Sequence, residues 1–244
     1  MKDRFSNHAP QYAAFRPVYP KALYESILKH VRTREAAWDC ACGNGQVARD
    51  LAPHFNKVFA TDISQKQLDS AYTASNIQYS IAPAEKTSFP DKSFDLIIVA
   101  QAMHWLRVND FFTEAKRTGK DGCVLAYWGY SLFRVDEEVD RVVDDFYINE
   151  IGPYWDPERK LIDDHYQSIK FPFEPLPVPK LDFSFDWTLQ ELEGYVTTWS
   201  SVQKFIRERG TNPVNDLMIR LRSYWLADQR RRVRFPLFVT MGRL

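Results

Sequence analysis

Two carboxylates and a pair of glycines lie close together between residues 39 and 62 of the chain. Asp39 ends a short apolar run, the turn Gly43-Asn44-Gly45 follows it, and Asp62 closes the next apolar run. Glycines in such a turn let the backbone approach a ligand closely and adopt positive φ. The helix predicted after the turn presents its amino end to whatever binds there, and Asp62 can accept hydrogen bonds from ribose hydroxyls. Together these positions predict a nucleoside site.

The glycine spacing leaves more than one ligand open. Gly43-x-Gly45-x-x-Ala48, followed by an acidic residue, also matches a dinucleotide fingerprint, so an NAD-dependent oxidoreductase is one alternative. A tight turn that binds nothing is the purely structural alternative. Asp39 favours a different ligand from a dinucleotide, because a carboxylate just before the glycines suits a ligand with no phosphates and with a cationic sulfonium and ammonium.

His104 follows the most continuous apolar run of the chain, Phe94–Ala100, and precedes Trp105. A histidine just after the carboxyl end of a strand is a candidate general base or acceptor ligand. A hydroxyl or protonated-amine acceptor would need such a base. A carboxylate acceptor would not, and His104 would then position it. The structural alternative is that His104 orients Trp105 or bonds a backbone carbonyl.

These residues require a scaffold of alternating strands and helices. Short apolar runs at 36–41, 57–61, 77–81, 94–100 and 123–128 alternate with helical patterns between about residues 20 and 130. A run as continuous as Phe94–Ala100 is typical of a strand buried on both faces of a parallel sheet. The pattern predicts an α/β fold, with a Rossmann-like, doubly wound and mostly parallel sheet.

Beyond Tyr130 the pattern changes. Segment 131–180 combines helical patterns with a proline-rich stretch that cannot be regular helix, so we predict a helical insertion, or cap, over the carboxyl edge of the sheet. Runs 181–187 and 233–241 add two strands to make seven. Pro236 favours an antiparallel edge position for the last one. We expect a single domain over 1–244, with a cofactor-binding core at 19–130 and segment 181–244 completing the sheet.

The composition of the chain limits the classes of molecule that we expect the protein to bind. The chain of 244 residues has a formal net charge of zero, which gives no general attraction to nucleic acid or to anionic membranes. No apolar run approaches the length of a membrane span or forms a secretory signal. Cys40-x-Cys42 is too close for an ordinary disulfide and lacks a second pair of metal ligands. We therefore expect a cytoplasmic protein, monomeric or homodimeric, that binds no metal, nucleic acid or membrane.

Four motifs, taken in order, resemble class I S-adenosylmethionine-dependent methyltransferases. They correspond to that family's first motif, its ribose-binding strand, its adenine-side loop, and its fourth strand with the active-site loop: Trp38–Gly45, Val58–Ile63, Ala82–Pro90 and Phe94–Trp105. The resemblance covers roughly residues 35–130. Ala41 departs from it, because many members carry a glycine there.

The resemblance implies S-adenosyl-L-methionine as cofactor and S-adenosyl-L-homocysteine as product. It implies contacts to the ribose, the adenine, the methionine part and the sulfonium from Asp39, Gly43, Asn44, Gly45, Asp62, Ile63, Ala84, Glu85, Gln101 and Ala102. Tyr12 and Arg16 precede the first helix, where the chain could fold across the mouth of the site. The Arg16 fork matches the carboxylate of the cofactor or of an acidic acceptor.

Three further segments are similar to the branch that includes trans-aconitate methyltransferases: Tyr12–Pro20, Gln101–Trp105 and Thr198–Ser201. That branch implies small-molecule acceptors, often carboxylic acids. Candidate acceptor-site residues are His104, Trp105, Arg134, Tyr154 and Trp199. We therefore expect a methyltransferase for a small, anionic metabolite. The alternative from another class is a non-catalytic methyltransferase-like protein that binds the nucleoside.

Overall fold

A computed structural model describes residues 15–244, and Tyr12 lies outside them. Seven strands of this part form one sheet in the order β3-β2-β1-β4-β5-β9-β6. The parallel strands are β1 Ala36–Cys40, β2 Lys57–Asp62, β3 Ile77–Ile81, β4 Phe94–Ala100 and β5 Gly119–Tyr130. The sequential order reverses between β1 and β4, which confirms the doubly wound, Rossmann-like class and places its ligand crevice at that switch point.

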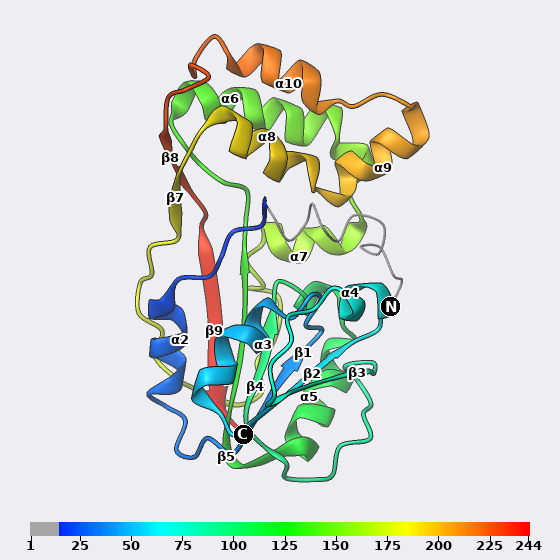
Figure 1. Cartoon of the computed structure of the whole chain (residues 1–244), viewed down its shortest axis with the longest axis vertical. Coiled ribbons are helices and arrows are strands. Elements are labelled where there is room, and N and C mark those ends of the chain that lie inside the picture. The colour runs from blue at the N-terminus through cyan, green and yellow to red at the C-terminus, as the bar shows by residue number, and fades with distance from the viewer. Residues whose placement is uncertain (1–14) are drawn as a thin grey trace.

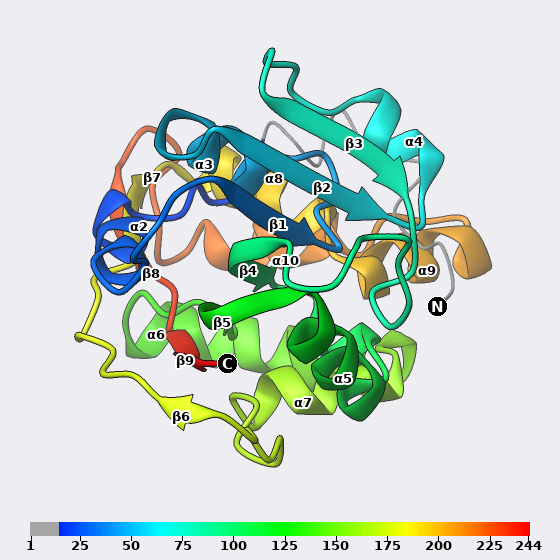
Figure 2. The ribbon, with the colours of Figure 1, turned by 90° about the horizontal axis from the view of Figure 1, so that it is seen from below.

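Helices cover both faces of the sheet (Figure 2). The face that carries Leu96 and Ile98 of β4 packs against α2 Lys21–Leu28 and α3 Gln46–Leu51. The face that carries Ile97 and Val99 packs against α5 Val108–Thr118 and α7 Lys160–Asp163. Successive side chains of a strand point to opposite faces, so the continuous apolar run of β4 supplies both cores.

A layer of helices lies beyond the carboxyl ends of the parallel strands (Figure 1). It consists of α6 Glu137–Asp145, η3 Phe146–Glu150, α8 Leu189–Thr197, α9 Ser200–Arg209 and α10 Val214–Leu221. Asp136 caps α6, and Thr188 with Glu191 forms a capping box that starts α8. The layer draws on segment 181–244 as well as on segment 131–180, and β9 is the part of the later segment that joins the main sheet.

The structure corrects two of the predicted strands. Run 181–187 does not join the main sheet, because β7 Ser184–Trp187 pairs with β8 Arg231–Arg234 in a separate two-stranded sheet. Run 233–241 is divided between β8 and β9 Leu237–Arg243, since Pro236 has no N–H to donate to a ladder. The seventh strand is β6 Glu174–Pro175, which pairs antiparallel with the end of β9.

Shorter helices connect these elements: η1 Ala52–His54, α4 Gln65–Asp69, η2 Met103–Trp105, η4 Gly152–Tyr154 and η5 Pro157–Arg159. Within residues 15–244 no helix is long and apolar enough to cross a membrane. The same residues contain no group of three or more His, Cys, Asp or Glu side chains that could hold a metal ion.

Candidate active site

The glycine turn after β1 adopts a backbone that only glycine accommodates well. Gly43 has φ 55° and Gly45 has φ 77°, which is the left-handed region. Gly45 is also the N-cap residue of α3. A Cβ at Gly45 would overlap the Tyr79 hydroxyl, so the close approach of β3 requires glycine a second time. Ala41 has φ 56°, in the same left-handed region, which would favour the glycine that the resembled family often carries at this position.

Asp39 is a buried carboxylate with an unsatisfied oxygen. It is 1% exposed, and its Oδ2 accepts a hydrogen bond from the Ala48 N–H at 2.8 Å. Its Oδ1 is buried and has no hydrogen-bond partner among the described residues. Burial raises the pKa of Asp39 to about 8 against the lowering effect of the Ala48 N–H, and the charges of Asp62 and Asp50 add to the rise. Such an oxygen suits a cationic group of a ligand.

Asp62, at the end of β2, holds the glycine turn in place. Its Oδ2 accepts the Gly43 N–H at 2.9 Å and its Oδ1 accepts the Ser64 N–H at 2.9 Å. Each carboxylate oxygen has two acceptor sites, so ribose hydroxyls could still be bound. The structure thus brings Asp39, Gly43, Asn44, Gly45 and Asp62 together at the crevice.

The residues predicted beside the adenine follow β2 and β3. Ala84 is buried, and Ile63 is half-buried beside Asp62. The Oε1 of Glu85 accepts the N–H of Arg107, the N-cap residue of α5, at 2.9 Å. Glu85 therefore ties the loop to α5, which is a structural role that the sequence pattern did not indicate.

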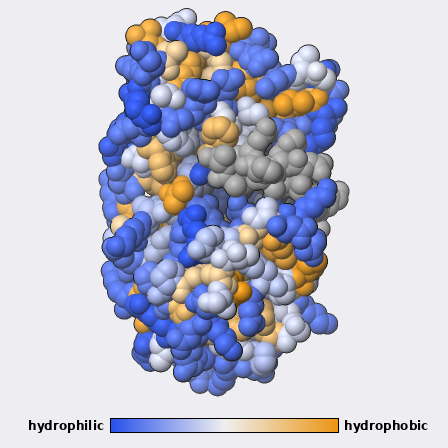
Figure 3. Space-filling view, viewed as in Figure 1, coloured by the Kyte–Doolittle hydropathy of each residue, from blue (hydrophilic) through white to orange (hydrophobic). Residues whose placement is uncertain are grey.

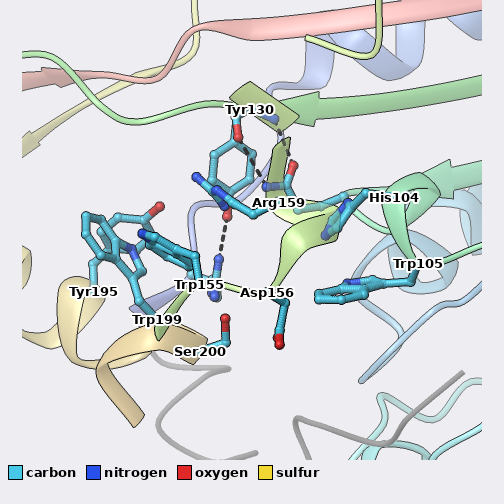
Figure 4. Close-up of a pocket in the computed structure, with 11 residues that line it drawn as sticks. His104, Trp105, Tyr130, Trp155, Asp156, Arg159, Tyr195, Trp199 and Ser200 are labelled. Atoms are coloured by element: carbon cyan, nitrogen blue, oxygen red, sulfur yellow. Dashed lines mark hydrogen bonds between the residues drawn. The ribbon is translucent and has the colours of Figure 1, made fainter. Parts of the chain in front are cut away.

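A cavity lies between the sheet's carboxyl edge and the helical layer. Its volume is about 50 Å³, room for about three to five water molecules or a group of similar size. In Figure 4, His104 and Trp105 lie on one side, and Trp155, Tyr195 and Trp199 lie on the other. The lining comes from the segment before α2, the ends of β4 and β5, η2, the segment from η4 to η5, and α8 and α9 with the residue between them: Arg16, Gln101, His104, Trp105, Tyr130, Trp155, Asp156, Arg159, Tyr195, Trp199 and Ser200. We call this cavity the candidate acceptor pocket.

Two polar side chains are fixed by Tyr130 at the end of β5. Arg16 Nη1 donates to the Tyr130 hydroxyl at 2.9 Å, and its guanidinium lies 5.6 Å from the centre of the Tyr195 ring. The amide of Gln101 accepts the Tyr130 N–H at 2.7 Å and donates to the Tyr130 carbonyl at 3.2 Å. Gln101 has φ 52°, and backbone strain of this kind is typical of functional sites.

Arg159 is a pocket residue that sequence reasoning missed. Its guanidinium stacks 4.7 Å from the Trp155 ring centre, and its Nε donates to the Tyr147 hydroxyl at 2.9 Å. No residue of 15–244 forms a hydrogen bond with its Nη1 or Nη2, and the nearest carboxylate, Asp163, lies 3.6 Å from Nε. The spacing Trp155-x-x-x-Arg159, typical of an aromatic–cation pair, was the available signal.

His104 is buried at the pocket wall. It is 7% exposed, and its Nδ1 lies 2.9 Å from the Tyr166 hydroxyl. Burial lowers the pKa of His104 to about 3, and the positive charge of Arg159 adds to that shift. The imidazole is therefore neutral at physiological pH.

Two predicted acceptor-site residues do not line this pocket. Arg134 pairs with Asp144 at 2.7 Å and lines a separate groove, because its backbone bridges to Arg234 where the chain leaves β5. Tyr154 accepts a hydrogen bond from Arg209 Nε at 2.8 Å, since η4 packs against α9. Proximity in sequence to pocket residues did not determine where these side chains point.

Comparisons with known proteins agree with this geometry. The family model described as "Methyltransferase domain" matches residues 38–127. A protein of Dictyostelium discoideum that is named a methyltransferase is 32% identical over 99% of this chain and 95% of its own length. A Saccharomyces cerevisiae protein named an S-adenosylmethionine-dependent methyltransferase is 30% identical over 49% of this chain and 44% of its own length.

A solved structure gives the same result at the level of the whole chain. It is that of an Anaeromyxobacter dehalogenans protein described as a type II methyltransferase, with a TM-score of 0.85 and 37% identity over 94% of this chain and 98% of that chain. The chain therefore belongs to the methyltransferase family. The protein is an S-adenosylmethionine-dependent enzyme of that family.

Proposed function

We propose that the enzyme transfers the methyl group of S-adenosylmethionine to a small carboxylic acid that binds as its anion. The observation that carries this proposal is the guanidinium fork of Arg159 in the candidate acceptor pocket: Nε donates to Tyr147 and lies near Asp163, whereas no residue of 15–244 forms a hydrogen bond with Nη1 or Nη2. Arg16 adds a second positive charge to the lining, and Asp156 is the only carboxylate among the residues described there. A planar fork matches a carboxylate in a bidentate arrangement.

The first site suits the cofactor. The Asp39 carboxylate, with its unsatisfied buried oxygen, would hold the cationic amino-acid end, and Asp62 with the glycine turn would hold the ribose. When bound, the cofactor supplies an electrophilic methyl group on a sulfonium. These residues support S-adenosylmethionine over NAD, because a cationic ligand would stabilise the ionised form of the buried Asp39, whereas a pyrophosphate would oppose it.

The pocket would act by orienting the acceptor and by excluding water from it. A carboxylate oxygen is already a nucleophile, so the C–O bond can form as the C–S bond breaks, without removal of a proton. Arg159 and Arg16 would orient the anion in line with the methyl group. The walls of Trp105, Trp155 and Trp199 would exclude water and leave the nucleophile less solvated.

Calorimetry followed by turnover tests the proposal. The purified protein is titrated with S-adenosylhomocysteine and, in parallel, with NAD. It is then incubated with methyl-labelled S-adenosylmethionine and a panel of small mono-, di- and tricarboxylic acids beside the corresponding amides and alcohols. We expect binding of S-adenosylhomocysteine alone and labelled esters from acids only. Labelled amides or ethers would overturn the acceptor class, and cofactor binding without any product would favour the non-catalytic alternative.

We also propose that the enzyme acts on free small molecules in the cytoplasm, as a monomer or homodimer, without nucleic acid or membrane. The zero net charge supports this. On the face shown in Figure 3, hydrophilic residues dominate and hydrophobic residues form scattered small groups. The free thiols of Cys40, Cys42 and Cys123 are compatible with a reducing compartment.

A further inference from the structure

His104 and Tyr166 form a buried pair that bridges the sheet edge and the segment after α7. The His104 Nδ1 and the Tyr166 hydroxyl oxygen are 2.9 Å apart. Both residues are buried, with His104 7% exposed and Tyr166 3% exposed. Tyr166 has φ 60° and His165 before it has φ 55°. Two successive left-handed residues that are not glycine persist only where the surroundings hold them, so the packing holds the Tyr166 hydroxyl against His104.

The hydrogens of this pair can be assigned by counting donors and acceptors. A tyrosine hydroxyl has one hydrogen to donate, and a neutral imidazole has one nitrogen that donates and one that accepts. Burial raises the pKa of Tyr166, so its hydroxyl keeps the hydrogen. Among residues 15–244, the only acceptor recorded for that hydrogen is His104 Nδ1. The opposite tautomer would leave a buried hydroxyl hydrogen unsatisfied, which is costly.

The second nitrogen of the ring is then a donor, on a side chain that lines the pocket. With Nδ1 accepting, the neutral ring carries its hydrogen on Nε2, and no residue of 15–244 forms a hydrogen bond with Nε2. The charged or titratable groups that line the pocket around it are Arg159 on η5, Arg16 before α2, Tyr130 on β5, Asp156 before η5 and Tyr195 on α8. No residue of that lining other than Asp156 carries a negative charge that would stabilise an imidazolium.

We infer that Tyr166 is a positioning residue that holds His104 as a neutral hydrogen-bond donor to the carboxylate of the acceptor, so that His104 is not a general base. The inference rests on the proposed function for its ligand, but the hydrogen assignment stands without it. One carboxylate oxygen would accept from His104 Nε2 while Arg159 binds the anion. The consequence for specificity is that only acceptors that arrive ionised are methylated. Neutral hydroxyls and protonated amines would find no group in this pair to take their proton.

Nuclear magnetic resonance of the full-length protein with ring-¹⁵N-labelled histidine tests the assignment directly. The chain has five histidines, and the His104→Gln variant identifies the signals of His104 by their loss. We expect the neutral Nε2–H tautomer between pH 5.5 and 8 in the complex with S-adenosylhomocysteine. In Tyr166→Phe, we expect both tautomers, because the donor to Nδ1 is gone. A wild-type Nδ1–H tautomer, or an imidazolium at pH 6, would overturn the inference and leave the proposed function untouched.

Kinetics with the best acid of the turnover panel tests the role of the donor. His104→Leu should raise KM by about tenfold to a hundredfold, the effect of losing a hydrogen bond to a charged group, and His104→Gln should recover most of that loss because its amide donates. A base would instead give a fall in kcat of about a hundredfold or more in both variants. Equal losses in the two variants would contradict a donor role. So would a wild-type kcat/KM for the acid, measured at saturating S-adenosylmethionine at every pH, that falls below pH 7 where the acid stays ionised. Unchanged affinity for S-adenosylhomocysteine shows that each variant is folded.

Discussion

Asp39 couples cofactor binding to a proton. Because burial raises its pKa to about 8, most of the cofactor-free protein holds the neutral acid at pH 7. A bound ammonium favours the carboxylate, so binding releases a proton below pH 8. We expect the affinity for S-adenosylhomocysteine to rise by up to about tenfold per pH unit from pH 6 to 8. Calorimetry in two buffers with different ionisation enthalpies measures both the affinity and the number of protons released on binding.

The Asp39→Asn variant is the control for that linkage. It should bind more weakly and lose the pH dependence, since no proton is then exchanged at this position. The same raised pKa lowers the free energy of unfolding of the cofactor-free protein as pH rises from about 4 towards 8, because the folded state disfavours the charged form of Asp39. An affinity that stays constant between pH 6 and 8 in the wild type would remove Asp39 from the ammonium site.

Arg159 should act on the acceptor and not on the cofactor. We expect Arg159→Gln to raise KM for a carboxylic acid by about tenfold to a hundredfold, the range of a charge-assisted hydrogen bond. The KM of Arg159→Lys should lie between those of the wild type and of Arg159→Gln, since lysine keeps the charge and loses the fork. Arg134→Gln is the matched control, because Arg134 lies in a separate groove. Steady-state kinetics measures these KM values. An equal rise in KM in Arg159→Gln and Arg134→Gln would argue against specific binding by Arg159.

At the scale of elements, the turn between β1 and α3 depends on Gly45 for two reasons that can be separated. Gly45→Ala would strain a φ of 77° and bring a methyl group onto Tyr79, whereas Gly210→Ala would strain a φ of 72° with nothing within 4 Å. We expect Gly210→Ala to cost about 1 kcal/mol of stability, and Gly45→Ala to cost more and to weaken binding of S-adenosylhomocysteine. Urea unfolding and calorimetry measure the two effects. Equal costs at the two positions would mean that Tyr79 simply moves aside.

Helix α5 is tied to the loop at 87–91 through Glu114. Burial opposes the charge of Glu114, but hydrogen bonds from Arg117 and Thr87 outweigh it and lower its pKa to about 2. A depressed carboxyl pKa stabilises the fold above the unfolded value near 4.5, and that stability is lost as pH falls towards 2. We expect Glu114→Gln to cost about 1–3 kcal/mol at pH 7. Denaturant unfolding should show the difference from wild type shrinking below pH 4.5, and a constant difference down to pH 3 would be the contrary result.

At the scale of the whole molecule, the sheet and the helical layer share one hydrophobic core. Trp128 of β5, Phe133 between β5 and α6, Trp199 before α9 and Phe235 between β8 and β9 all belong to it. Phe133 is fully buried against Trp199 and Phe235. We therefore expect a single cooperative transition in calorimetric unfolding, and a loss of about 3–5 kcal/mol in Phe133→Ala. Two separate transitions in the wild type would show that the layer folds independently of the sheet.

The sequence by itself determined the parts of the protein that depend on short segments. The five parallel strands follow from apolar runs, because each strand's burial is written in its own side chains. Gly43, Gly45 and Asp62 could be placed beside one another, since parallel strands end at the same edge of a sheet. The structural ties of Glu85 and Gln101 were not visible in this way, because their partners Arg107 and Tyr130 are remote in the chain.

Only the tertiary structure decided which residues form the candidate acceptor pocket and which strands form the far edge of the sheet. Arg16, Tyr130, Arg159 and Tyr195 come from four separate segments, and the direction of a side chain on a cap is set by packing that no local pattern records. The same holds for β6 and for the β7–β8 pair. A backbone N–H pairs with whichever strand tertiary packing brings beside it, so strand propensity predicts that a segment is extended but not its partner.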